Sequence, residues 1–106
     1  DHALPWIQGR VPRMAARLDV TPTAISVKDL GYRWGSCGKG GRLYFHWRCI
    51  LLPPMAVEYI IVHELAHLEE PHHTPRFWQL VERALPDFAE RRRWLAENAR
   101  AASTRP

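Results

Sequence analysis

The sequence predicts an α+β domain in which one helix is followed by a small three-stranded sheet and then by three further helices. Short segments of alternating apolar and polar residues flank the glycine-rich run Gly38–Gly41, which is typical of a β-hairpin. A nearly continuous apolar stretch follows Pro53-Pro54 and indicates a central, buried helix. The length of 106 residues corresponds to one compact domain, residues 1–106.

The elements before the central helix follow from hydrophobic spacing. Residues 4–18 are expected to be helical, with Trp6, Met14 and Leu18 in contact with the core. Three strands are expected next, over residues 24–27, 32–37 and 43–50. In the last strand, apolar residues alternate with polar ones and are expected to share one buried face: Leu43, Phe45, Trp47 and Cys49.

The two cysteines are expected to be free thiols. A hairpin centred near Gly40 places Cys37 opposite Leu43, so Cys49 lies about 20 Å further along the strand. A disulfide requires Cα atoms within about 7 Å of each other. The sequence therefore predicts a reducing compartment, with the cytoplasm as the expected location.

The central helix is expected to run from Pro53 to about Glu70 and to stop at Pro71. Its apolar side chains point in nearly all directions, which is typical of a helix in the middle of a domain.

Two shorter helices complete the predicted fold. Thr74 is expected to cap the first of them and Pro86 to end it. Asp87 and Glu90 are expected to form a capping box for the last helix. Residues 101–106 are expected to fray.

The charge pattern leaves two interpretations open. The net charge is +4, and 13 of the 15 basic residues are arginines, with a dense run at Arg91–Arg93. Such a run usually forms a solvated helix face, and contact with nucleic-acid phosphates is the alternative. No apolar run approaches the length that crosses a bilayer, so no membrane partner is expected.

The central helix carries the motif His63-Glu64-Leu65-Ala66-His67. Two histidines four residues apart project from one helix face, with Cβ atoms about 5–6 Å apart, and can bind one zinc ion together. Glu64 lies about 100° further round the helix, too far to share that face as a ligand. It is close enough to act on a metal-bound water as a general base.

A structural interpretation of the motif is weaker. Three ionisable groups in an otherwise apolar helix would be costly without partners, whereas a metal ion satisfies them together. A closed structural zinc site would need four protein ligands and would leave Glu64 without a role. Several side chains could donate to the oxyanion, each more often structural: Tyr32, His46, Tyr59, His72 and Arg76.

The motif and the segment His73–Trp78 resemble the YgjP-like metal-dependent hydrolases, small zincins related to the SprT and minigluzincin groups. The resemblance covers roughly residues 10–97. Further segments match family signatures in the same order: Arg33–Cys37, Phe45–Arg48, and Leu85–Asp87 with Arg91–Trp94. The resemblance implies a zincin-like α+β fold and a peptidase-type zinc site. In that site His63, His67 and His73 are the ligands and Glu64 is the base.

The same resemblance points to two departures and to a substrate-binding mode. Family members usually carry an additional N-terminal β-rich portion, so this chain is expected to be a fragment or a minimal version. His72 stands where the family more often has Asn. In zincins the sheet edge above the active helix binds substrate as an added strand. Which strand forms that edge is left open, and Arg33 and Trp34 are expected to have packing roles.

The residues around the motif also favour one candidate for the third metal ligand. Pro71 stops the helix and lets the chain reverse, and the Thr74 cap fixes the backbone of the residue before it. That residue is His73, which also matches the family position. His72 and Glu82 are the alternatives.

The sequence thus predicts a zinc-dependent metallopeptidase that binds one Zn²⁺ ion and cleaves peptides or unfolded proteins through a metal-activated water. A monomer is expected. One alternative is a nucleic-acid-associated SprT-like protease module that uses the Arg-rich helix. The other is a zinc-stabilised interaction domain without turnover.

Overall fold

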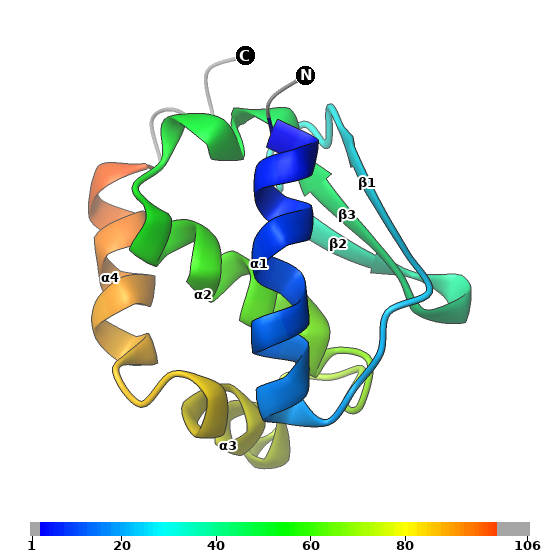
Figure 1. Ribbon diagram of the computed structural model, residues 1–106. Coiled ribbons are helices and arrows are strands. Elements are labelled where there is room, and N and C mark those ends of the chain that lie inside the picture. The colour runs from blue at the N-terminus through cyan, green and yellow to red at the C-terminus, as the bar shows by residue number, and fades with distance from the viewer. Residues whose placement is uncertain (1–2, 100–106) are drawn as a thin grey trace.

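Residues 3–99 are described by a computed structural model, which has the predicted α+β architecture (Figure 1). The helices and strands, in chain order, are α1 (Ala3–Leu18), β1 (Ala24–Lys28), β2 (Gly35–Gly38), β3 (Arg42–His46), α2 (Pro54–Ala66), α3 (Pro75–Ala84) and α4 (Phe88–Asn98). Two short 3₁₀ segments, η1 (Lys39–Gly41) and η2 (Trp47–Leu51), flank β3. The predicted order of one helix, three strands and three helices is confirmed. The expectation for residues 101–106 falls outside the described residues.

The sheet has the strand order β1-β3-β2, so β3 is central. β1 pairs with β3 in parallel, and β2 pairs with β3 in antiparallel. Cys37 lies opposite Leu43, as the hairpin predicted, and both cysteines are free. Leu43 and Phe45 are fully buried on the core face of β3.

β3 is shorter than predicted, because it ends at His46 rather than near residue 50. The His46 side chain accepts a hydrogen bond from the backbone N–H of Arg48 at 3.1 Å and so caps η2. The change from strand to 3₁₀ geometry breaks the predicted alternation. Trp47 is 41% exposed instead of buried, whereas Cys49 is buried.

β2 also begins later than predicted, at Gly35 instead of residue 32. The Asp29 carboxylate accepts a hydrogen bond from the backbone N–H of Gly31 at 2.8 Å. Gly31 has a φ of +67°, a left-handed conformation that glycine adopts without strain. The chain therefore turns here, and Tyr32 is left 73% exposed.

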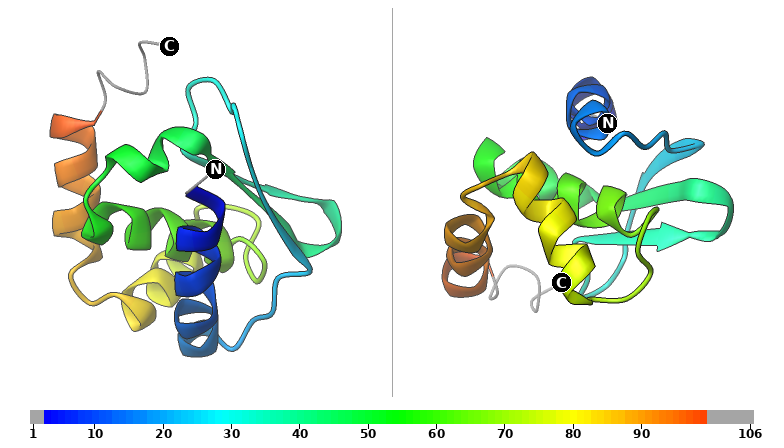
Figure 2. Two further views of the ribbon diagram at one scale, coloured as in Figure 1. Left: turned by 45° about the horizontal axis from the view of Figure 1, so that its top comes forward. Right: turned by 90° about the horizontal axis from the view of Figure 1, so that it is seen from below.

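α2 is the central helix, in contact with α1, α3, α4 and β2 (Figure 2). Its buried residues lie on all sides of the helix, as the apolar pattern predicted. It ends at Ala66, four residues before the predicted end. The N–H groups of Leu68 and Glu69 bond to carbonyls three residues back, which tightens the chain into a turn ahead of Pro71.

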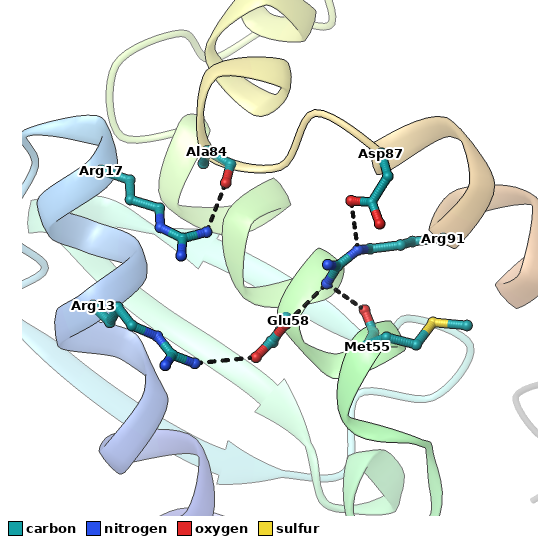
Figure 3. Close-up of polar contacts among 7 residues, drawn as sticks. All are labelled: Arg13, Arg17, Met55, Glu58, Ala84, Asp87 and Arg91. Carbon is teal, nitrogen blue, oxygen red and sulfur yellow. Dashed lines mark hydrogen bonds and ion pairs between the residues drawn. The ribbon is translucent and has the colours of Figure 1, made fainter.

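An ion-pair network around Glu58 ties α2 to α1 and α4 (Figure 3). Arg91 of α4 donates to Glu58 at 2.9 Å and to the carbonyl of Met55 at 3.2 Å. Arg13 of α1 donates to the other carboxylate oxygen at 3.3 Å. Arg17 of α1 donates to the carbonyl at the end of α3 at 2.9 Å.

The two last helices begin in different ways. The Thr74 side chain accepts a hydrogen bond from the N–H of Phe77, which confirms the predicted cap of α3. The predicted capping box of α4 is wrong. Asp87 makes no side-chain cap bond and accepts instead from Nε of Arg91 at 2.9 Å, because the guanidinium competes for the same carboxylate. Within residues 3–99 no helix has the length and apolar character that a membrane span needs.

Candidate metal centre

Three histidines meet at the C-terminal end of α2. His63 lies in its last turn, and His67 is the C-cap residue. His73 comes from the loop between Pro71 and the Thr74 cap. Its Nε2 atom is 3.3 Å from Nε2 of His63 and 3.1 Å from Nε2 of His67. Among the described residues this is the group of His, Cys, Asp and Glu side chains that is close enough to hold a metal ion together.

The donor set fits a zinc ion. Zinc binds imidazole nitrogens at about 2.0–2.1 Å, so two ligands of a tetrahedral site lie about 3.3–3.4 Å apart. The Nε2 atom of His73 lies 3.3 Å from that of His63 and 3.1 Å from that of His67, close to this value. Three imidazole ligands also leave a fourth position open, which is the arrangement of catalytic rather than structural zinc.

Contacts to Nδ1 orient two of the three rings. Nδ1 of His67 lies 3.1 Å from the carbonyl oxygen of Glu70, in the turn that ends α2. A carbonyl only accepts, so His67 carries its proton on Nδ1 and directs the Nε2 lone pair at the other histidines. Nδ1 of His63 lies 3.4 Å from the Tyr59 hydroxyl, one turn earlier on α2. Such outer contacts fix the tautomer and the ring orientation of metal ligands.

Glu64 lies beside this cluster and faces β2. It is 7% exposed, and its side chain passes close under the backbone of Gly35. A Cβ atom at Gly35 would lie 2.8 Å from Cγ of Glu64 and 3.0 Å from Oε2. Glycine at this strand position is thus what lets the carboxylate sit between the sheet and the helix.

Burial shifts the pKa values of the site in the directions that chemistry at neutral pH requires. Burial raises the pKa of Glu64 to about 7, against an opposing effect of the Arg33 guanidinium. Burial lowers the pKa of His63 to about 4, with further lowering by His67, His73 and Arg92. The pKa of His67 is lowered as well, first by burial. Neutral histidines are the form that binds metals.

A cleft runs between β2 and the end of α2. Its volume is about 720 Å³, and it is lined by β2, the three histidines, Glu64 and Arg33. A second hollow of about 290 Å³ shares Arg33, Gly35, His63 and Glu64 with the cleft. Its remaining walls are mainly apolar: Trp34, Tyr59, Ile60 and Leu95. The sequence did not show which strand forms the sheet edge above the active helix. In the structure this strand is β2, an edge strand that borders the metal cluster.

The alternatives for the third ligand lie elsewhere. His72 and Glu82 are exposed, and neither belongs to the three-histidine cluster. Among the side chains considered for the oxyanion, Tyr59 contacts His63 and lines the apolar hollow. His46 is buried, and both of its ring nitrogens have partners: Nε2 lies beside the Asp29 carboxylate, and Nδ1 accepts a hydrogen bond from the backbone N–H of Arg48.

Three residues of the site have roles that the sequence reasoning did not assign. Gly35 makes room for Glu64, and Arg33 lines both hollows instead of being packed away. Trp78 stacks on His73, with ring centroids 5.9 Å apart. All three belong to the two segments Arg33–Cys37 and His73–Trp78, whose match to the family is the feature of the sequence that marks them.

A histidine cluster, a buried carboxylate and an open strand edge on an α+β scaffold define the class of metal-dependent hydrolases with a minimal zincin-like fold. The sequence matches the family model "YgjP-like, metallopeptidase domain" over residues 1–98. The chain belongs to this family, so it is a metal-dependent peptidase, as the resemblance implied.

A solved structure has the same fold. The crystal structure of the metallopeptidase zymogen of Pyrococcus abyssi abylysin superposes with a TM-score of 0.76 at 23% sequence identity. The match covers 89% of this chain and 96% of that chain. No curated protein sequence matches the chain.

Proposed function

We propose that this protein is a zinc peptidase in which His63, His67 and His73 hold one zinc ion and Glu64 is the general base. The observation that carries the proposal is the convergence of three Nε2 atoms beside a buried carboxylate that has no cation bound to it among residues 3–99. A zinc ion in such a site supplies a Lewis acid that polarises the scissile carbonyl and acidifies water.

The chain's own residues supply the proton transfers. Glu64 accepts a proton from the attacking water and delivers it to the leaving amine as the peptide bond breaks. A pKa near 7 suits a group that both accepts and donates a proton at neutral pH. The low pKa of His63 keeps its imidazole neutral and available as a ligand.

The open edge of β2 supports an extended peptide as the substrate. A peptide that adds to this edge in antiparallel orientation runs from the Gly38 end towards the Gly35 end. The residue that follows the cleaved bond then lies at the Gly35 end, over the hollow walled by Trp34 and Leu95. A large apolar side chain suits these walls.

The Arg-rich segment supports the nucleic-acid alternative less than its sequence suggested. Arg91 is held by Glu58 and Asp87, and the Arg92 guanidinium lies 4.6 Å from the centroid of the Trp78 ring. Two of the three arginines therefore have partners within the domain, which weakens the case for a free basic face.

The remaining expectations stay proposals. We propose that residues 1–106 act as one domain and as a monomer. Free thiols at Cys37 and Cys49 are compatible with the cytoplasm as a reducing compartment. Burial raises the pKa of Cys49 to about 12, so this thiol stays protonated at physiological pH.

Elemental metal analysis combined with a proteolysis assay tests the proposed function. The purified protein should contain about one zinc per chain and cleave an unfolded protein or a peptide library. Glu64→Gln keeps the size of the side chain but cannot accept the proton. It should keep its zinc and lose about 10²–10⁴-fold in rate.

Glu58→Gln is the matched control, because it changes a glutamate of the same helix outside the cleft. It should retain zinc and most of the activity. Zinc-loaded wild type that cleaves no substrate would favour the non-catalytic interaction domain, and wild-type activity in Glu64→Gln would refute the role of the base.

A further inference from the structure

The third histidine of the cluster is oriented differently from the other two. Nδ1 of His63 contacts the Tyr59 hydroxyl, and Nδ1 of His67 contacts the carbonyl of Glu70. For His73, the polar contacts within residues 3–99 are those of Nε2 to the other two imidazoles. Its ring lies in an exposed loop, so its orientation must come from packing.

Two aromatic side chains of α3 contact the His73 ring. Phe77 lies edge-on, with ring centroids 4.9 Å apart and planes at 75°. Trp78 stacks on it, with centroids 5.9 Å apart and planes at 29°. Phe77 also touches His63 and His67 and is fully buried in the core. Trp78 also lies edge-on to His63, with ring centroids 6.1 Å apart and planes at 72°. Of the three histidines, His73 is the one on which Trp78 stacks, and this stacking sets it apart.

Trp78 is in turn held by α4. Phe88, the first residue of α4, stacks on its ring, with centroids 5.6 Å apart and planes at 22°. Arg92 lies one turn further along the same face of α4, with its guanidinium carbon 4.6 Å from the ring centroid. α4 is anchored on α2 by the pair between Arg91 and Glu58. A chain of contacts thus links α4 to the third ligand.

We propose that Trp78 is the positioning residue of His73, and that α4 strengthens metal binding through it. The inference rests on the proposed metal site and extends it beyond the ligands. An imidazole without an Nδ1 partner loses rotational freedom when it binds a metal ion, and this loss weakens binding. Stacking on Trp78 restricts the ring before the metal arrives, so the third ligand is preorganised.

A pair of substitutions separates the stacking from simple packing. Trp78→Phe keeps an aromatic ring over His73, whereas Trp78→Leu keeps apolar volume without a ring. Zinc affinity is measured on metal-free protein by competition with a chromogenic chelator. We expect Trp78→Phe to stay within about twofold of wild type and Trp78→Leu to bind zinc about three- to tenfold more weakly.

Two further variants test the specificity of the effect. Trp94→Leu changes a half-buried tryptophan of α4 that has no ring contact with the metal cluster in the described chain, and it should leave zinc affinity unchanged. Phe88→Leu should weaken zinc binding by about two- to threefold through Trp78. Unchanged affinity in Phe88→Leu would overturn the contribution of α4.

Thermal unfolding of the metal-free variants shows whether a loss of affinity is merely a loss of fold. Trp78→Phe and Trp78→Leu should unfold within a few degrees of each other, while their zinc affinities differ. Equal zinc affinity for both variants would overturn the positioning role. Zinc affinity that is unchanged in His73→Ala would instead refute His73 as the third ligand of the proposed site, which distinguishes failure of the proposed function from failure of this inference.

Discussion

Two glutamates of α2 occupy contrasting environments within two turns of each other. Glu58 receives hydrogen bonds from Arg91 and Arg13 (Figure 3). Its side chain is 18% exposed. Glu64 is more deeply buried and has neither a hydrogen bond nor an ion pair within residues 3–99. The cation that affects it, Arg33, acts on its pKa without a direct pair.

The contrast shows how the chain distinguishes a structural charge from a chemical one. Around Glu58 the protein supplies its own counter-charges, so three helices are joined by a satisfied network. Around Glu64 and the three histidines it leaves lone pairs and a carboxylate facing a cleft. A buried carboxylate without a partner is costly, and three imidazole Nε2 atoms converge beside Glu64, so this side of α2 is suited to a ligand that comes from outside the chain.

The largest expected effect is the loss of zinc affinity when His73 is replaced. His73→Ala should weaken zinc binding by more than about 100-fold, beyond the loss that an outer-shell change causes. His72→Ala and Glu82→Ala should bind zinc as wild type does, because both residues lie outside the cluster. Side-by-side zinc titrations of the three variants decide the matter. Loss of binding in either of the latter two, with His73→Ala unaffected, would reassign the third ligand.

The next largest effect is a loss of stability when the ion-pair network around Glu58 is broken. Glu58→Ala removes one of the two carboxylates that pair with Arg91 and leaves Asp87 as the other. This change should lower the free energy of unfolding by about 2–3 kcal/mol. The Arg13 pair adds little, because that side chain is 64% exposed. Zinc affinity should fall by no more than about two- to threefold, the effect expected when α4 is loosened, because Glu58 itself lies outside the metal cluster. Urea unfolding with and without zinc measures both quantities, and a variant that unfolds like wild type but loses zinc would reverse the roles assigned to the two glutamates.

Local patterns in the sequence predicted the parts of the molecule that depend on local physics. The spacing of His63 and His67 on α2, the Thr74 cap and the register of Cys37 against Leu43 all follow from short-range rules, and the structure has the corresponding geometry. The errors arose where a side chain found a distant or competing partner. Asp87 pairs with Arg91 rather than capping α4.

The other features of the site depend on contacts between elements that are far apart in the sequence, so they could be identified only in the folded chain. The choice of β2 as the strand beside the cleft depends on sheet topology, which pattern alone left open. The roles of Gly35 and Trp78 depend on approaches between elements far apart in the sequence. Gly35 of β2 approaches Glu64 of α2, and α4 approaches Trp78.

A pH series in the metal-free protein tests how strongly burial affects Glu64. The folded-state pKa of Glu64 is about 7, above its ordinary value, so folding favours the protonated carboxyl. Its contribution to stability is complete below the ordinary pKa and is lost as pH rises through 7. Relative to Glu64→Gln, wild type should therefore lose about 2 kcal/mol of stability between pH 5 and pH 7.

Lowering of the His63 pKa acts in the opposite direction, since stability is lost as pH falls from about 6.5 towards 4. This effect is present in both wild type and Glu64→Gln, so it cancels in the difference. A difference between these two proteins that stays constant from pH 5 to 7 would show that Glu64 is not desolvated.

The smallest expected effect tests how closely the sheet confines the free carboxylate. Gly35→Ala places a methyl group 2.8 Å from Cγ of Glu64, so the side chain must move. Because a displaced base transfers protons less efficiently, kcat should fall about tenfold while zinc content stays the same.

Gly38→Ala is the matched control on the same strand. Its methyl group would meet the Tyr44 ring at 2.8 Å, so it should lower stability and, because Gly38 lies on the proposed peptide-binding edge, raise KM, but leave kcat near wild type. If both variants lose activity in proportion to their loss of stability, β2 supports the site only through the fold. If Gly35→Ala alone loses kcat at full stability, the strand positions the base directly.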